Sequence, residues 1–190
     1  IIIYSMLLPA KAQEVPTKGE NLKCLITFGK NGDPSWGDDD FSQTFFFFIP
    51  LNQKLPIYIR VYDPDIAADF DEFNGAPDTK VKFSVYGGKE AYSNLDARAL
   101  SPTGKYQSGV LLASKTFGNE KDYNLKWYTF GPFNPTEGEL SNELGGYVFK
   151  VIAEGQGGND GNNYKYFLSS KLNDNIAIEG GNAFTYEYSF

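Results

Sequence analysis

The sequence is poor in the residues on which many enzymes and metal sites depend. Its 190 residues include no histidine, one cysteine and one methionine. Without histidine there is no Ser-His-Asp triad, no Cys-His pair and no histidine-ligated zinc or iron. A single cysteine excludes an intrachain disulfide and a thiolate zinc cluster. Enzymes built on paired carboxylates, or on lysine and tyrosine bases, are not excluded because they need no histidine.

Positive charge is also scarce. Lys and Arg total 17 against 24 Asp and Glu, which gives a formal net charge of −7. An acidic chain without a basic stripe is poorly suited to bind a phosphate backbone, so we do not expect nucleic acid as a partner.

Aromatic residues and turn-forming residues are abundant instead. There are 16 Phe and 13 Tyr, together with 20 Gly and 10 Pro. Aromatic and β-branched runs separated by Gly, Asn, Asp and Pro are typical of strands and turns. We therefore predict an all-β protein, an antiparallel β-sandwich that is jelly-roll-like and has about nine strands. These strands are expected at 22–28, 43–49, 57–62, 79–86, 109–117, 126–130, 146–153, 163–170 and 184–190, with a further short piece at 176–178.

Two of these segments differ in their pattern. The run 45–49 contains four Phe and one Ile without polar alternation, so both faces of this strand are expected to be covered. In the segment 57–62, by contrast, Ile57, Ile59 and Val61 alternate with other residues and predict one buried face.

The first residues resemble a targeting segment. An apolar run at 1–9 precedes Ala10-Lys11-Ala12, the small-residue pattern of a signal-peptide cleavage site. We predict that 1–12 is a signal-peptide remnant, 13–20 a linker and 21–190 a single β-sandwich domain. The mature protein would then begin near Gln13 and be extracytoplasmic, either secreted or at the cell surface. The alternative is a hydrophobic N-terminal strand; the run is too short for a membrane span, which needs about 20 residues.

Carboxylates are concentrated after the segment 57–62. Five of them occur between residues 63 and 72, and another follows closely. No Lys or Arg lies between Asp63 and Thr79, and crowded carboxylates repel one another unless a cation neutralises them or they reach solvent. Calcium binds six to eight oxygen ligands from such loops. We predict a calcium site whose candidate ligands are Asp63, Asp65, Asp69, Asp71, Glu72 and Asp78, of which the first, second and fourth are the strongest.

Other interpretations of this loop remain open. The spacing is not that of an EF-hand, because the sixth position from Asp63 is Ala68 and the twelfth is Asn74. A solvated acidic turn is one alternative. A glycosidase with paired carboxylates is another, although nothing in the sequence marks the apolar cleft that would raise the pKa of its acid.

Two further loops are rich in oxygen ligands. The segment 33–40 could hold a second ion, but we favour a charged turn there. The segment 157–163, Gly-Gly-Asn-Asp-Gly-Asn-Asn, could supply carbonyl and amide oxygens. Its glycines by themselves suit a hairpin with positive φ, which is the simpler interpretation.

Parts of the chain resemble a known family. The segments 46–49 and 57–65 are followed by Gly146-Tyr147-Val148-Phe149-Lys150-Val151 and by a Tyr-to-Ser strand at 164–169. Over roughly residues 41–170 this order is similar to the bacterial pre-peptidase C-terminal type of domain. The resemblance implies a non-catalytic accessory module of secreted bacterial proteins, in some cases calcium-binding. A long insert around 84–116 departs from the family pattern.

Two functions are therefore expected from the sequence. The first is a non-catalytic, calcium-binding module of a secreted or cell-surface bacterial protein, part of a larger chain. The alternative is a carbohydrate-binding module, since sugar rings stack on exposed aromatic faces. The expected partners are a polysaccharide or other domains of the same chain, without a transmembrane span. The candidate stacking residues are Trp36, Trp127, Tyr106 and Tyr92.

Overall fold

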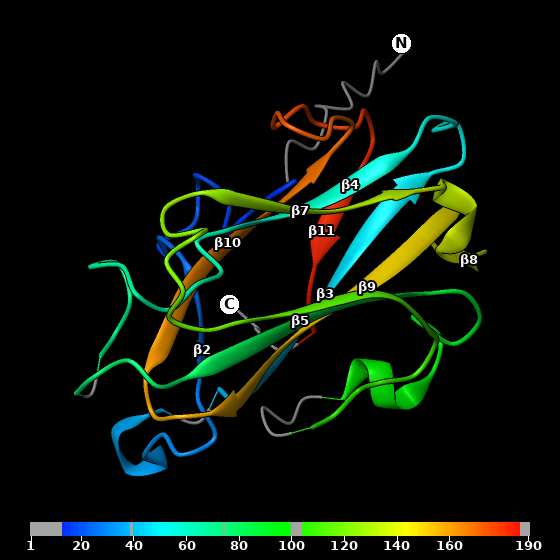
Figure 1. Ribbon diagram of the computed structural model, residues 1–190. Coiled ribbons are helices and arrows are strands. Elements are labelled where there is room, and N and C mark those ends of the chain that lie inside the picture. Colours follow the sequence, from blue (N-terminus) through cyan, green and yellow to red (C-terminus); the bar gives the residue numbers. More distant parts are fainter. Residues whose placement is uncertain (1–12, 39, 74, 100–103, 187–190) are drawn as a thin grey trace, which may run out of the picture.

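The chain folds into two antiparallel sheets that pack face to face (Figure 1). The computed structural model describes residues 13–38, 40–73, 75–99 and 104–186. These residues form eleven strands and three short 3₁₀ turns. The prediction of an all-β antiparallel sandwich is confirmed.

The first sheet has the order β1-β10-β4-β7, and β2 pairs with the other half of β10. Its strands are β1 (Glu14–Val15), β2 (Leu25–Phe28), β4 (Ile57–Tyr62), β7 (Trp127–Phe133) and β10 (Gly161–Ser169). The second sheet has the order β11-β3-β9-β5-β6, with β8 paired to β9. Its strands are β3 (Ser42–Pro50), β5 (Lys80–Gly87), β6 (Val110–Phe117), β8 (Glu139–Ser141), β9 (Gly146–Gly157) and β11 (Asn182–Phe184).

The strand count of about nine is corrected to eleven in the described residues. The two additional strands, β1 and β8, are two and three residues long and carry no apolar alternation that the sequence would reveal. β1 lies in the segment 13–20, which we expected to be a linker, and pairs with β10. Gln13 beside it is buried: its carbonyl accepts from the N–H of Leu168, and its side chain bonds to Ile178 and Gly181.

Residues 176–178 form no strand, and residues 1–12 lie outside the described part of the chain.

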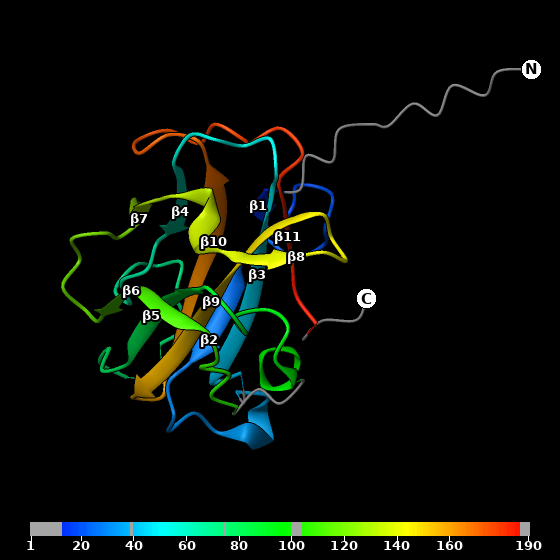
Figure 2. The same cartoon turned by 90° about the vertical axis from the view of Figure 1, so that its right-hand side faces the viewer.

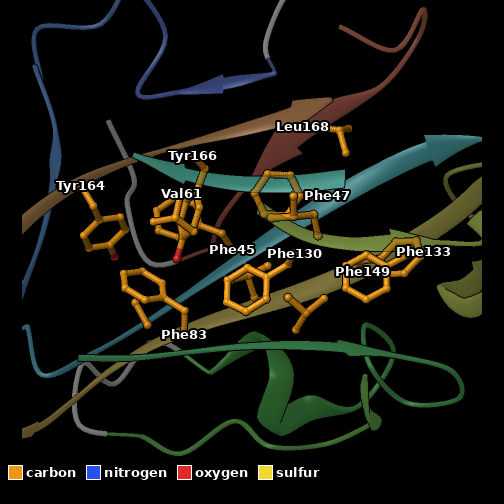
Figure 3. Close-up of a cluster of buried hydrophobic side chains, with 14 of the residues drawn as sticks. Phe45, Phe47, Val61, Phe83, Phe130, Phe133, Phe149, Tyr164, Tyr166 and Leu168 are labelled. Carbon is orange, nitrogen blue, oxygen red and sulfur yellow. The ribbon is translucent and has the colours of Figure 1, made fainter. Parts of the chain in front are cut away.

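The core lies between the two sheets and is largely aromatic (Figure 3). Alternate residues of β3, β5 and β9 meet alternate residues of β4, β7 and β10, as the period of two in a strand requires. Phe83, for example, contacts Tyr164 edge to face with ring centroids 5.0 Å apart. Ile57, Ile59 and Val61 are fully buried, so the alternation predicted for 57–62 is confirmed.

Both faces of the Phe run in β3 are covered, as predicted. Phe45 and Phe47 enter the core between the sheets, whereas Phe46 packs on the outer face against Tyr92. The connection between β5 and β6, which contains the 3₁₀ turn η2 (Leu95–Arg98), covers this outer face (Figure 2). The long insert therefore completes the burial of the second sheet.

Candidate calcium-binding site in the acidic loop

The acidic loop, residues 63–78, connects β4 to β5 and separates its carboxylates into two groups. Asp63, Asp65 and Asp71 are buried, with exposed fractions of 0%, 2% and 8%. Asp69, Glu72 and Asp78 are exposed. The three carboxylates that the sequence ranked first are thus the three that the fold removes from water.

Asp63 is the first residue after β4 and turns the chain sharply. Its φ of 56° lies in the left-handed region, which Asp tolerates better than most residues. Its N–H donates to the carbonyl of Lys126 at 2.9 Å, and its Oδ1 accepts from the N–H of Leu125 at 2.8 Å. Its Oδ2 is buried and has no hydrogen-bond partner among the described residues.

Asp65 and Asp71 attach the loop to two further segments. Asp65 Oδ2 accepts from the N–H of Tyr123 at 2.5 Å, in the connection between β6 and β7. Asp71 Oδ1 accepts from the N–H of Asn163 in β10 at 2.9 Å. Asp71 Oδ2 accepts from the N–H groups of Ala67 and Ala68 within the loop. Each buried carboxylate therefore accepts hydrogen bonds from backbone N–H groups that anchor the loop.

Burial raises the pKa of all three groups. The pKa of Asp63 rises to about 6 and that of Asp71 to about 7, in both cases chiefly because the charged form loses its hydration. Hydrogen bonds from Leu125 and Asn163 oppose these shifts, whereas repulsion between neighbouring carboxylates adds to them. The pKa of Asp65 is also raised by burial. Asp63 and Asp71 therefore hold a proton up to about pH 6 and about pH 7, and above those values each is a buried anion.

The neighbouring basic residues do not neutralise the loop. Arg60, which precedes it in β4, donates to Thr129 and Asn175 and lies over the ring of Trp127. Lys115 lowers the pKa of Asp65 but forms no ion pair with it. Among the described residues, Asp63, Asp65 and Asp71 have no ion-pair partner.

Amide side chains that the sequence did not single out complete the surroundings of Asp63. Asn162 in β10 is fully buried, and its Nδ2 donates to the carbonyl of Pro64 at 2.7 Å. Its Oδ1, the acceptor atom of the amide, has no hydrogen-bond partner among the described residues. The Oδ1 of Asn124, next to the Leu125 that donates to Asp63, is likewise buried and unpartnered within the described residues. The only signal in the sequence was the Asn pair at 162–163, within the loop noted as rich in amide oxygens.

These oxygens have the chemistry of calcium ligands. Asp63, Asn162 and Asn124 each hold a buried acceptor oxygen that needs a donor or a cation. No group of three acidic, His or Cys side chains among the described residues is arranged to hold a metal by itself. A calcium ion at this place would therefore use amide oxygens as well as carboxylates.

The segment 157–163 has the expected positive φ, 79° at Gly158, but it is not the predicted hairpin: β9 and β10 belong to different sheets, so this segment crosses from one sheet to the other. Asp160, which it buries completely, accepts from the N–H groups of Asp78 and Thr79 and so fixes the end of the acidic loop. In the segment 33–40, Asp33 caps a 3₁₀ turn, η1 (Pro34–Trp36), as expected of a charged turn.

The four aromatic candidates for sugar stacking lie in different surroundings. Tyr92 and Tyr106 are 3% and 4% exposed, so neither presents a ring face to a ligand. Both were expected to be exposed; they are buried because the β5–β6 connection packs on the second sheet. Trp127 is half-buried between Tyr62 and Phe167. Trp36 alone of the four is open, with 84% of its surface exposed.

Comparison with protein-family models, with curated proteins and with solved structures finds no match to this chain. The resemblance to the pre-peptidase C-terminal type of domain therefore remains a prediction. None of the described helical segments is long or apolar enough to cross a membrane.

Proposed function

We propose that the protein is a non-catalytic, calcium-binding β-sandwich module of a secreted or cell-surface bacterial protein. One observation carries the proposal: the fully buried carboxylate of Asp63 has one oxygen without a partner among the described residues. Two buried amide oxygens are in the same condition, on Asn162, which bonds to the neighbouring Pro64, and on Asn124, which precedes the Leu125 that donates to Asp63. Burying an anion without a counter-ion costs free energy. A calcium ion would supply the counter-charge and could be coordinated by all three oxygens.

The residues that would hold the ion follow from their remaining acceptor capacity. Asp63 Oδ2, Asn162 Oδ1 and Asn124 Oδ1 are available, and Asp65 accepts the N–H of Tyr123 through Oδ2, which leaves Oδ1 for an ion. Asp71 accepts three N–H groups through its two oxygens and acts as a positioning residue for the loop. Asp69, Glu72 and Asp78 are exposed and are not needed as ligands.

An extracytoplasmic location of the protein is consistent with the contacts of Gln13. Cleavage after Ala12 would leave Gln13 at the N-terminus with its bonds to Leu168, Ile178 and Gly181 intact. Sequencing the N-terminus of exported protein tests this location: a mature chain that still begins at Ile1 would contradict it.

Calcium binding is tested by titrating the metal-free protein with calcium in a calorimeter and by comparing thermal unfolding in calcium and in chelator. An ion that binds only the folded state at a hundredfold excess over its Kd stabilises it by about 2.7 kcal/mol. For a domain of this size that corresponds to a rise in Tm of about 5–10 °C.

Matched variants locate the ion. Asp63→Asn should abolish both the heat of binding and the rise in Tm, and Asn162→Leu should weaken binding at least tenfold. Asp69→Asn, which changes an exposed carboxylate of the same loop, should retain both signals. Absence of calcium binding by the wild type, or loss of binding in Asp69→Asn but not in Asp63→Asn, would refute this site.

A further inference from the structure

A cleft of about 470 Å³ opens on the side of the molecule where β2 ends, outside the buried carboxylate site. Four segments line it: the end of β2, the η1 loop, the residues after Asp71 and the β9–β10 connection. The η1 loop and this connection lie side by side (Figure 1), joined by the hydrogen bonds of Gly29 to Asp160 and Asn31 to Gly158. The lining residues are Phe28, Asp33, Trp36, Asp38, Glu72, Phe73 and Asn159.

Two aromatic side chains in this cleft are exposed. Trp36 is 84% and Phe73 is 42% accessible to solvent. Large aromatic surfaces left in water favour contact with a ligand. The backbone that carries Trp36 is well fixed: Asp33 caps the turn by accepting from the N–H and hydroxyl of Ser35, and Gly37 closes it with a φ of 88°.

The polar groups of the cleft are mostly acceptors. Asp33, Asp38 and Glu72 contribute carboxylates, and no Lys or Arg is among its described lining residues. The hydrogen bonds from Ser35 lower the pKa of Asp33, which keeps that group ionised. The amide of Asn159 and the indole N–H of Trp36 are the side-chain donors among the described lining residues. A ligand that fits must therefore bring many donors and no negative charge.

We propose that this cleft binds a glycan made of amino sugars, with a sugar ring on Trp36 and its ammonium and hydroxyl groups directed to the carboxylates. The flat C–H face of a sugar suits an exposed indole, and an ammonium is attracted both by carboxylates and by aromatic faces. Glycans with uronic acids or sulfates are repelled by the three carboxylates. A peptide fits less well, because its backbone brings as many acceptors as donors to a cleft that offers few donors.

The test compares two glycans that share a backbone and differ in charge, together with an anionic glycan and a cationic peptide. Calorimetric titrations use a glucosamine oligomer, the matching N-acetylglucosamine oligomer, an oligogalacturonate and an oligolysine peptide, at a slightly acidic pH that keeps amines protonated. The glucosamine oligomer should bind at least tenfold more tightly than its acetylated form, and its affinity should fall as salt is added. The oligogalacturonate should not bind.

Variants identify the residues involved. Trp36→Ala should weaken binding of the glucosamine oligomer at least tenfold, and Glu72→Gln should weaken it about fivefold with a smaller effect on the acetylated oligomer. Leu55→Ala, which removes an exposed apolar side chain elsewhere, should change nothing. Trp36 and Glu72 are exposed, so both variants are expected to fold.

Three results would overturn the proposal: no binding of the glucosamine oligomer, equal binding of the oligogalacturonate, or binding that Trp36→Ala leaves unchanged. Binding of oligolysine without binding of the sugar would also overturn it and assign the cleft to a basic polypeptide. The proposal does not depend on calcium. Asp63→Asn should keep glycan binding, so the two sites can fail separately.

Discussion

Two acidic loops of this protein have similar composition and opposite surroundings. In the loop 63–78, three carboxylates are buried and accept hydrogen bonds from backbone N–H groups. In the loop 29–40, Asp33 and Asp38 line an open cleft around an exposed Trp36. The same residue type thus accepts backbone hydrogen bonds from distant segments inside the fold in one loop, and lines an open cleft in the other.

The difference arises from what packs against each loop. The loop 63–78 lies between the β6–β7 connection and the start of β10, which supply donors from Tyr123, Leu125 and Asn163. The loop 29–40 contacts the rest of the fold in part through the β9–β10 connection, where Gly29 approaches Gly158 so closely that an added Cβ would come within 2.2 Å of its carbonyl oxygen. In this loop Asp33 is exposed, and Asp38 and Asp40 are half-buried.

The largest expected effect distinguishes buried from exposed carboxylates within one loop. Asp71→Ala leaves three backbone N–H groups without their acceptor and should lower the free energy of unfolding by about 4 kcal/mol. Asp71→Asn keeps one acceptor oxygen and should cost about half as much. Asp69→Ala should cost less than about 0.5 kcal/mol. Urea unfolding measures all three, and equal losses for Asp71→Ala and Asp69→Ala would mean that burial does not distinguish these groups.

The next effect concerns pH. Asp63 and Asp71 have pKa values raised from 3.8 to about 6 and about 7 in the folded protein. Between these values and the unfolded pKa the folded state holds protons that the unfolded chain has released, so the free energy of unfolding should fall as pH rises from about 4 to 7. For Asp63 alone the fall is on the order of 3 kcal/mol. Calcium should reduce this fall, because the ion would replace the proton on Asp63.

The measurement is urea unfolding of metal-free protein at several pH values across this window. Asp63→Asn should have a flatter pH dependence than the wild type, whereas Asp69→Asn should follow the wild type. A wild-type stability that rises steadily over the same window would contradict the assignment of raised pKa values to the buried group.

The smallest effect lies in the exposed loop. Asp33→Ala removes the cap of η1 without exposing any buried donor, so the unfolding midpoint should not change measurably. The loss of the cap should instead loosen Trp36. Fluorescence anisotropy of Trp36 in a Trp127→Phe background should show faster local motion, and affinity for the glucosamine oligomer should fall about threefold. Asp38→Ala leaves the cap intact, so similar motion in that variant would show that the cap does not fix Trp36.

Several features of the fold could be predicted from local sequence. The alternation of Ile57, Ile59 and Val61 identified a strand with one buried face, and the Phe run identified one covered on both faces. The clustering of carboxylates after β4 located a loop with unusual electrostatics. These features repeat every second residue or occur within a few residues, so the chain encodes them without reference to distant parts.

The surroundings of each side chain depended on the tertiary structure. That Asp63 is buried and Asp69 exposed follows from contacts with residues 123–126 and 161–163, which lie about 60 to 100 positions away along the chain. Tyr92 and Trp36 were both candidates in the sequence, with Trp36 the one expected to be exposed, but only the structure shows that Tyr92 is covered by packing against Phe46. Asn162 lay in a segment that the sequence marked as rich in amide oxygens, but its burial and its bond to Pro64 depend on where β10 is placed. Sequence determines local periodicity and composition, whereas burial and the pairing of polar groups arise from contacts between distant segments, which no local pattern specifies.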